Sequence, residues 1–183
     1  MSEKIPSEEE AISLLRKVGC QPNVVNHCIA VMRVAAKIAR KIRTRGLNVN
    51  IHLVRVGALL HDIGRSKTHS VNHAVVGGRI ARSLSLPDPI ISIIEKHVGG
   101  GITPEEAERL GWPKGDYMPR TIEEKIVTYA DKLVEGSREV SLKRTLDKLK
   151  KELGANHPAL DRIKRLEKEI LRILNDSPKG QTC

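Results

Sequence analysis

Apolar residues recur every three or four positions along most of the chain, and this periodicity limits the possible folds more than any other feature. Such spacing places apolar side chains on one face of a helix. The alternating patterns bounded by hairpin turns that indicate strands are hard to find. The 183 residues are 39% hydrophobic, enough for one domain with a buried core. We therefore predict an all-α fold with a single domain over residues 1–183.

Helix boundaries can be predicted from capping boxes, in which Ser or Thr is followed three residues later by Glu. Ser7 and Glu10, Thr103 and Glu106, and Thr121 and Glu124 form three such pairs. Apolar stripes and Gly or Pro breaks define the other helices. We expect helices over 7–18, 22–43, 51 to His61-Asp62-Ile63-Gly64, 70–85, 87–98, and from 103 and 121 onward.

Two strongly amphipathic segments follow near the C-terminus. Leucines at 142, 146, 149 and 153 repeat at helical spacing, and apolar residues at 163, 166, 170 and 173 do the same after Asn156-His157-Pro158. We predict a helical hairpin over 137–175 that packs on the core or forms a homodimer interface. Residues 176–183 are expected to be a flexible tail.

The charge balance favours anionic partners. Lys and Arg number 32 against 22 Asp and Glu, a net charge of +10, so nucleic acid, phosphorylated small molecules and acidic proteins are all candidates. Phe is absent and only Trp112, Tyr117 and Tyr129 are aromatic. The composition therefore argues against a stacking platform for RNA, whereas contact with the RNA backbone stays open.

Composition also bears on the compartment. No apolar run approaches the roughly 20 residues of a membrane span, and the first residues lack a signal peptide's apolar stretch. Cys20, Cys28 and Cys183 are too few for a disulfide framework or a cysteine zinc site. We expect a cytoplasmic protein, and the 30% of charged residues favours a heat-adapted source.

Histidines and aspartates occur within or at the ends of apolar predicted helices. They are His27, His61, Asp62, His73, His97 and Asp131. Burying these groups separately would cost several kcal/mol each, roughly, unless they neutralise one another or bind a cation. Convergence on a metal explains all six, and the adjacent pair His61-Asp62 can direct an imidazole and a carboxylate at one point.

This ordered series resembles the HD-domain superfamily of metal-dependent phosphohydrolases, which has a leading His, a His-Asp doublet, further His residues and a late Asp. The matching segments are LLHDIGR at 59–65, NHAVVGGRIA at 72–81, IIEKH at 93–97 and YADKL at 129–133. The resemblance covers about residues 22–135, the expected HD metal-binding core. It implies an HD-domain helical bundle.

Carried over by position, the resemblance implies that His27, His61, Asp62 and Asp131 bind one divalent ion. In members with two ions, Asp62 would bridge to a second ion held by His73 and His97. The alternative is one bound ion, with His73 and His97 contacting substrate or forming hydrogen bonds in the core. Mixed nitrogen and oxygen ligands suit Fe, Mn, Co, Ni or Zn, and a hydroxide held between two such ions would be the nucleophile.

Basic residues near the doublet are candidates for substrate contact. Arg65 and Lys67 could bind substrate phosphates or be solvated surface residues, with neither interpretation favoured. Lys96 and Lys132 flank ligand positions and could add positive potential, although a solvated role is the simpler interpretation.

The resemblance leaves the substrate open. HD-GYP cyclic-dinucleotide phosphodiesterases carry a paired His-His-Glu, whereas Val98 and glycines follow His97 here. The layout is closer to small archaeal HD proteins, and partly to di-iron hydrolases of dinucleoside tetraphosphates. We predict an enzyme, a metal-dependent phosphohydrolase of a nucleotide or phosphorylated metabolite. The alternatives are an RNA-end or tRNA-linked phosphohydrolase and a noncatalytic metal-containing module that binds RNA or regulates.

Overall fold

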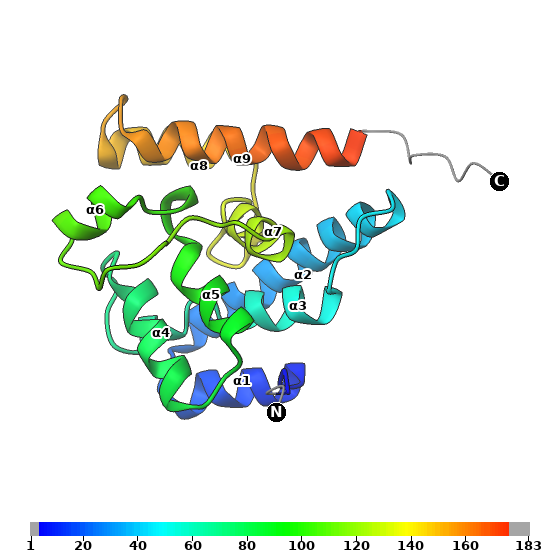
Figure 1. Ribbon diagram of the computed structural model, residues 1–183, viewed down its shortest axis with the longest axis vertical. Coiled ribbons are helices and arrows are strands. Elements are labelled where there is room, and N and C mark those ends of the chain that lie inside the picture. The colour runs from blue at the N-terminus through cyan, green and yellow to red at the C-terminus, as the bar shows by residue number, and fades with distance from the viewer. Residues whose placement is uncertain (1–3, 176–183) are drawn as a thin grey trace.

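The computed structural model describes residues 4–175, which form a mainly helical domain (Figure 1). The α-helices are α1 (Glu8–Lys17), α2 (Pro22–Thr44), α3 (Ile51–Leu60), α4 (His73–Ser83), α5 (Asp88–Lys96), α6 (Pro104–Arg109), α7 (Ile122–Asp131), α8 (Leu142–Leu153) and α9 (Pro158–Asn175). Two short 3-10 helices, η1 (Ile63–Ser66) and η2 (Val98–Gly100), follow α3 and α5. The all-α prediction is confirmed.

The three capping boxes form as the sequence predicts. The side chains of Ser7, Thr103 and Thr121 each accept a hydrogen bond from the backbone N–H three residues on, and the Glu side chain at that position accepts one from the backbone N–H of the cap residue. Each box satisfies amide groups that the first helical turn leaves free. Pro22 occupies the first turn of α2, where its missing N–H costs nothing.

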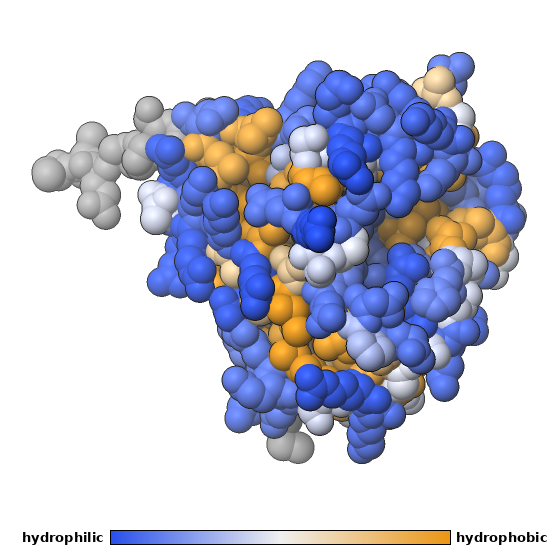
Figure 2. Space-filling view, turned by 180° about the vertical axis from the view of Figure 1, so that it is seen from behind, coloured by the Kyte–Doolittle hydropathy of each residue, from blue (hydrophilic) through white to orange (hydrophobic). Residues whose placement is uncertain are grey.

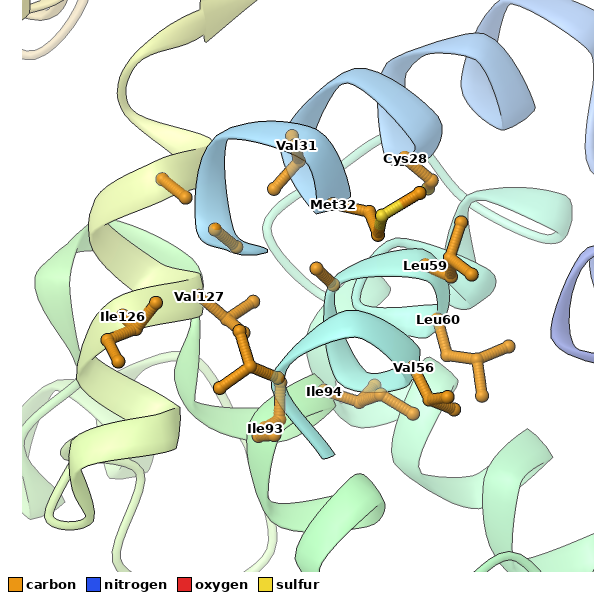
Figure 3. Close-up of a cluster of buried hydrophobic side chains, with 14 of the residues drawn as sticks. Cys28, Val31, Met32, Val56, Leu59, Leu60, Ile93, Ile94, Ile126 and Val127 are labelled. Atoms are coloured by element: carbon orange, nitrogen blue, oxygen red, sulfur yellow. The ribbon is translucent and has the colours of Figure 1, made fainter. Parts of the chain in front are cut away.

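The core lies where α2, α3, α5 and α7 meet (Figure 3). Val31 and Met32 of α2 face Leu59 and Leu60 of α3, and isoleucines and valine from α5 and α7 close the other side. In α3 every residue from Val56 to Leu60 is buried, which fits its nearly continuous apolar sequence. These helices form the rigid frame whose ends carry the candidate ligands.

One glycine allows η1 to lie directly against α4. A Cβ atom added at Gly64 would lie 1.9 Å from the carbonyl oxygen of His73 and 2.6 Å from the amide nitrogen of Gly77. A residue with a side chain therefore cannot occupy this position without moving backbone. The contact holds Asp62, the residue before η1, close to the first residue of α4.

The C-terminal helices differ in how they pack. Ile163, Leu166 and Ile170 of α9 are buried against the core, and α9 contacts η2 and α7. In α8 only Leu142 is buried, and Leu153 is 45% exposed. Helix α9 therefore packs on the core, and the homodimer interface stays a prediction. The predicted tail, 176–183, lies outside the described residues.

A small antiparallel hairpin between α7 and α8 was not predicted. Val134–Glu135 (β1) pairs with Arg138–Glu139 (β2), and Gly136 takes a positive φ of 59° in the turn. The helical hairpin predicted over 137–175 is therefore wrong at its start, where residue 137 lies in the turn and β2 follows, and α8 starts at Leu142. Strands of two residues are too short to show the alternation that identifies a strand.

Hydrophilic residues cover most of the surface seen from behind, with apolar residues gathered in a few areas (Figure 2). Among residues 4–175, no helix is both long and apolar enough to cross a bilayer.

Candidate metal centre

Six side chains from five helices converge on one region of the domain. His27 lies in the second turn of α2, and Asp131 is the last residue of α7. His61 and Asp62 follow α3, His73 begins α4, and His97 caps the end of α5. All six predicted metal ligands thus lie together, and five of them lie at the ends of helices.

Each of the four imidazoles is oriented by a hydrogen bond from Nδ1 to a backbone carbonyl. The acceptor is Ala58 for His61, Ser70 for His73 and Ile94 for His97, each at 2.7 Å. His27 donates to Gly136 in the hairpin turn at 2.8 Å. Because Nδ1 carries the proton in this arrangement, Nε2 presents a lone pair toward the centre, which is the form that binds metals.

The first group of ligands surrounds Asp131. Its Oδ1 lies 3.1 Å from His27 Nε2 and 3.5 Å from His61 Nε2. The Oδ2 atom of Asp62 lies 3.8 Å from His27 Nε2 and 3.7 Å from His61 Nε2. Four donor atoms at these separations match the edges of a coordination shell around one cation, in which each metal–ligand distance is about 2 Å.

The second group lies around the other oxygen of Asp62. Its Oδ1 is 3.1 Å from His73 Nε2 and 3.5 Å from His97 Nε2. The two imidazole Nε2 atoms are 3.0 Å apart. The Asp62 carboxylate therefore faces one group of ligands with each oxygen, which is the arrangement of a bridging ligand between two cations.

Two features show that these residues fit a metal. Among residues 4–175, His61 Nε2 and Asp62 Oδ1 are buried side-chain atoms without a hydrogen-bond partner, and such atoms are costly unless a ligand satisfies them. In addition, His73 Nε2 and His97 Nε2 point lone pairs at each other across 3.0 Å, because both Nδ1 protons are already donated. A bound cation would satisfy the two buried atoms and would remove the repulsion between the two nitrogen lone pairs.

The ionisation of the ligands favours a cation as well. Burial alone would raise the pKa of Asp62, but the neighbouring His61 and the imidazoles of His73 and His97 outweigh it, and this pKa lies well below its usual value. The same holds for Asp131, where Lys132 and His27 oppose burial. Burial lowers the pKa of His97 to about 4. Both carboxylates are thus anionic and His97 is neutral at pH 7, as metal ligands must be.

Of the four basic residues predicted to lie near substrate, the structure places two beside the carboxylates of the cluster and two away from them. Arg65 Nε lies 2.6 Å from Asp62 Oδ2, and Lys132 Nζ lies 2.5 Å from Asp131 Oδ2. Lys67 is exposed and forms no side-chain hydrogen bond or ion pair with residues 4–175, so it lies outside the cluster. Lys96 points instead to Glu124, 3.0 Å away. Arg65 and Lys132 are the basic residues that reach the ligand carboxylates.

Sequence reasoning did not identify the supporting groups. The carbonyl of Gly136 belongs to the unpredicted hairpin, and the carbonyls of residues 58, 70 and 94 carry no sequence signal, because any residue supplies one. Glu124 was recognised only as a helix cap, yet it is buried and accepts hydrogen bonds from Ser92 and Lys96 beside His97.

The cluster opens to solvent on one side. The side chains of His61 and His97 are 0% and 2% exposed, whereas those of His27, Asp131 and Arg65 are 18%, 14% and 30% exposed. A cavity of about 190 Å³ begins at Asp131 and continues between β1 and α8 past Lys132, Arg144 and Lys148. The exposed side of the cluster therefore lies along α2, η1 and the end of α7, next to this cavity.

Comparison with known proteins agrees with this architecture. The family model of the HD domain matches residues 24–135, which carry all six candidate ligands. The chain belongs to the HD-domain family, the superfamily of metal-dependent phosphohydrolases that its motifs resemble.

Several curated relatives are similar over most of the chain. An uncharacterized protein of Methanocaldococcus jannaschii is 47% identical over 91% of this chain and 98% of its own length. A tRNA (cytidine(56)-2′-O)-methyltransferase of Thermoplasma volcanium is 41% identical over 93% of this chain. The matched region is 48% of that enzyme, so the chain spans about half its length. A ribonuclease Y of Chloroflexus aurantiacus is 33% identical over 73% of the chain and 22% of its own length.

Solved structures share the fold. The HD domain of the phosphodiesterase PgpH from L. monocytogenes, in complex with cyclic-di-AMP, superposes with a TM-score of 0.55 at 20% identity. The match covers 92% of this chain and 99% of that domain.

Proposed function

We propose that this protein is a metal-dependent phosphohydrolase that uses two divalent cations. The observation that carries the proposal is the position of Asp62, whose two carboxylate oxygens face separate groups of histidine nitrogens. His27, His61 and Asp131 would complete one ion's shell, and His73 and His97 the other's. When bound, such cations activate water and neutralise phosphate oxygens.

The chain's own residues complete the site. The carbonyls that accept from Nδ1 fix the imidazoles before any ligand arrives, so little rearrangement is needed on binding. Arg65 is partly exposed at the opening, where its remaining N–H groups can donate to two oxygens of one phosphate. The cavity beside Asp131 provides space for the group that leaves with the ester oxygen.

The test is elemental analysis of the protein purified without chelator, together with hydrolysis of nucleotides and chromogenic phosphate mono- and diesters. We expect about two transition-metal ions per chain and turnover that depends on them. His97→Ala should remove one ion and most of the turnover, whereas His52→Ala, an exposed histidine of α3, should change neither. A chain that binds no metal after reconstitution would disprove the proposal.

RNA is the second candidate substrate. It is favoured by relatives named tRNA methyltransferase and ribonuclease Y, and by the net charge of +10. This proposal predicts faster release of phosphate from RNA ends than from mononucleotides with the same metal. Equal rates on both would favour a nucleotide or small-metabolite substrate.

A further inference from the structure

The positive charge of this chain is concentrated in one segment. Pro22–Arg45 contains six of the 32 basic residues and no acidic residue, so it supplies +6 of the net charge of +10. The rest of the chain is nearly balanced. The residues are Arg33, Lys37, Arg40, Lys41, Arg43 and Arg45.

Four of these residues share one exposed face of α2. Arg33, Lys37, Arg40 and Lys41 follow one another at spacings of four, three and one, which places them along one side of a helix. All four are exposed, and none forms an ion pair within residues 4–175. Glu8 lies near enough to Arg40 to feel its charge, but Arg55 holds its carboxylate. We call these four residues the α2 basic stripe.

The stripe leads away from the opening of the metal centre. His27, a ligand on the exposed side of the cluster, lies on α2 next to the edge of this face. From His27 to Lys41 the helix rises about 20 Å, at ~1.5 Å per residue. That is the length of about six nucleotides of a strand stacked at ~3.4 Å each.

Resting on the phosphohydrolase function proposed above, we propose that the α2 basic stripe binds the sugar–phosphate backbone of RNA whose scissile phosphate lies at the metal centre. Unpaired lysines and arginines on a rigid helix suit a repeating row of phosphates, because the contacts need no base recognition. The scarcity of aromatic residues, 2% of the chain, agrees with binding through the backbone. The substrate class is therefore a polynucleotide.

Two other partners fit this surface less well. A helix that lies on a membrane inserts an apolar face between lipids, whereas the apolar face of α2 is buried in the protein core. An acidic protein would need several carboxylates at the spacing of the stripe. A nucleic acid supplies a regular row of anionic phosphates whatever its base sequence.

The test compares two variants that remove equal charge. In the first, the four stripe residues are changed to Gln. In the second, Arg109, Lys114, Lys150 and Lys151 are changed to Gln. The control residues are exposed and form no ion pair within residues 4–175, and α6 lies across the molecule from the end of α2 (Figure 1). Equal thermal unfolding midpoints would show that both variants fold.

Binding of a short single-stranded RNA is measured on chelator-treated protein over a series of salt concentrations. The stripe variant should bind at least tenfold more weakly than the unchanged protein at ~100 mM salt, and its slope of log K against log salt should be smaller by about 3. The control variant should stay within about threefold.

Equal losses in both variants, or no loss in the stripe variant, would overturn the inference. So would a stripe variant that keeps RNA binding but no longer binds phosphatidylserine vesicles, because the partner would then be a membrane. Hydrolysis is not needed for this measurement. A chain that binds RNA through the stripe but hydrolyses no phosphate ester would sink the proposed function and leave the binding surface standing.

Discussion

At the scale of single residues, the arrangement of the metal centre depends on hydrogen bonds that fix each histidine ring. His61, His73 and His97 each donate from Nδ1 to a carbonyl three residues earlier. His27 donates to Gly136, far away in sequence. The sequence singled out all six residues that cluster in the structure, because histidines and aspartates on apolar helices need partners, and their role as metal ligands stays a prediction. It could not show the tautomers, since these depend on where each carbonyl points.

Asp62 is the residue on which both ions should depend. Because its two oxygens face different ligand groups, Asp62→Asn should weaken both sites at once. We expect bound metal to fall from about two ions per chain to well under one, and turnover to fall by at least 100-fold, roughly. Elemental analysis and steady-state kinetics measure these effects.

Asp161→Asn is the matched control, since Asp161 is exposed on α9 and lies outside the cluster. It should retain full metal content. An Asp62→Asn protein that keeps two ions would show that the carboxylate does not bridge them.

At the scale of elements, the centre is built from the ends of helices held at fixed separations. The sequence predicted most of these helices because caps and apolar periodicity are local signals. It missed β1 and β2, whose four residues show no periodicity. It also missed that Gly64 allows η1 to touch α4, because close backbone approach leaves no local mark in a sequence.

Gly64→Ala tests the contact between η1 and α4. The added methyl group would overlap the backbone of His73 and Gly77, so the two elements must separate. We expect a loss of about 3 kcal/mol in the free energy of unfolding, measured by urea denaturation, and weaker binding of the ion at His73. Gly115→Ala meets only ordinary contacts with Tyr117 at 3.5 Å and should be nearly neutral. Equal stability of the two variants would contradict the packing described.

Glu124 joins α7 to α5 through a buried carboxylate. Burial alone would raise its pKa, but hydrogen bonds from Ser92 and from the N–H groups of Arg120 and Thr121 outweigh it, so the pKa lies below its usual value. A lowered pKa means that the ionised group stabilises the folded state above its unfolded pKa of about 4.3. This contribution is lost as the pH falls through the lower, folded pKa.

Glu124→Gln should therefore cost about 2 kcal/mol at pH 7, and the difference from the unchanged protein should shrink as the pH falls below about 4. Denaturation curves at several pH values measure this. Glu10→Gln is the control, because Glu10 forms the same capping box on an exposed helix. A loss from Glu124→Gln that is independent of pH would show that the charge contributes nothing.

At the scale of the whole molecule, the metal centre ties together α2, α3, α4, α5 and α7. Ions that bind only the folded chain stabilise all of these elements at once. The total charge follows from composition alone. The position of the basic face relative to the centre depends on how α2 packs, because either side of a helix can face the solvent.

Removal of metal should therefore lower the stability of the entire domain. At an ion concentration ~1,000 times the dissociation constant, the stabilisation is about 4 kcal/mol, and for a chain of this size that is about 8–16 °C in Tm. Calorimetry before and after chelation, and after readdition of Mn²⁺ or Zn²⁺, measures the shift. The Asp62→Asn protein should show little response, and a chain whose Tm ignores chelation would contradict a centre built into the fold.

His61 and His97 are hydrogen-bonded to carbonyls at the ends of α3 and α5, and His73 to the turn that leads into α4, so each ring is held in a fixed position relative to its helix. The distances between their nitrogens are then set by how far apart the helices pack, as at the contact of Gly77 with Ile94. If ions bind here as proposed, the hydrophobic interior should set the preference among cations of different radius. Exchange of an isoleucine for a valine behind the ligands is expected to shift ion selectivity while every ligand remains in place.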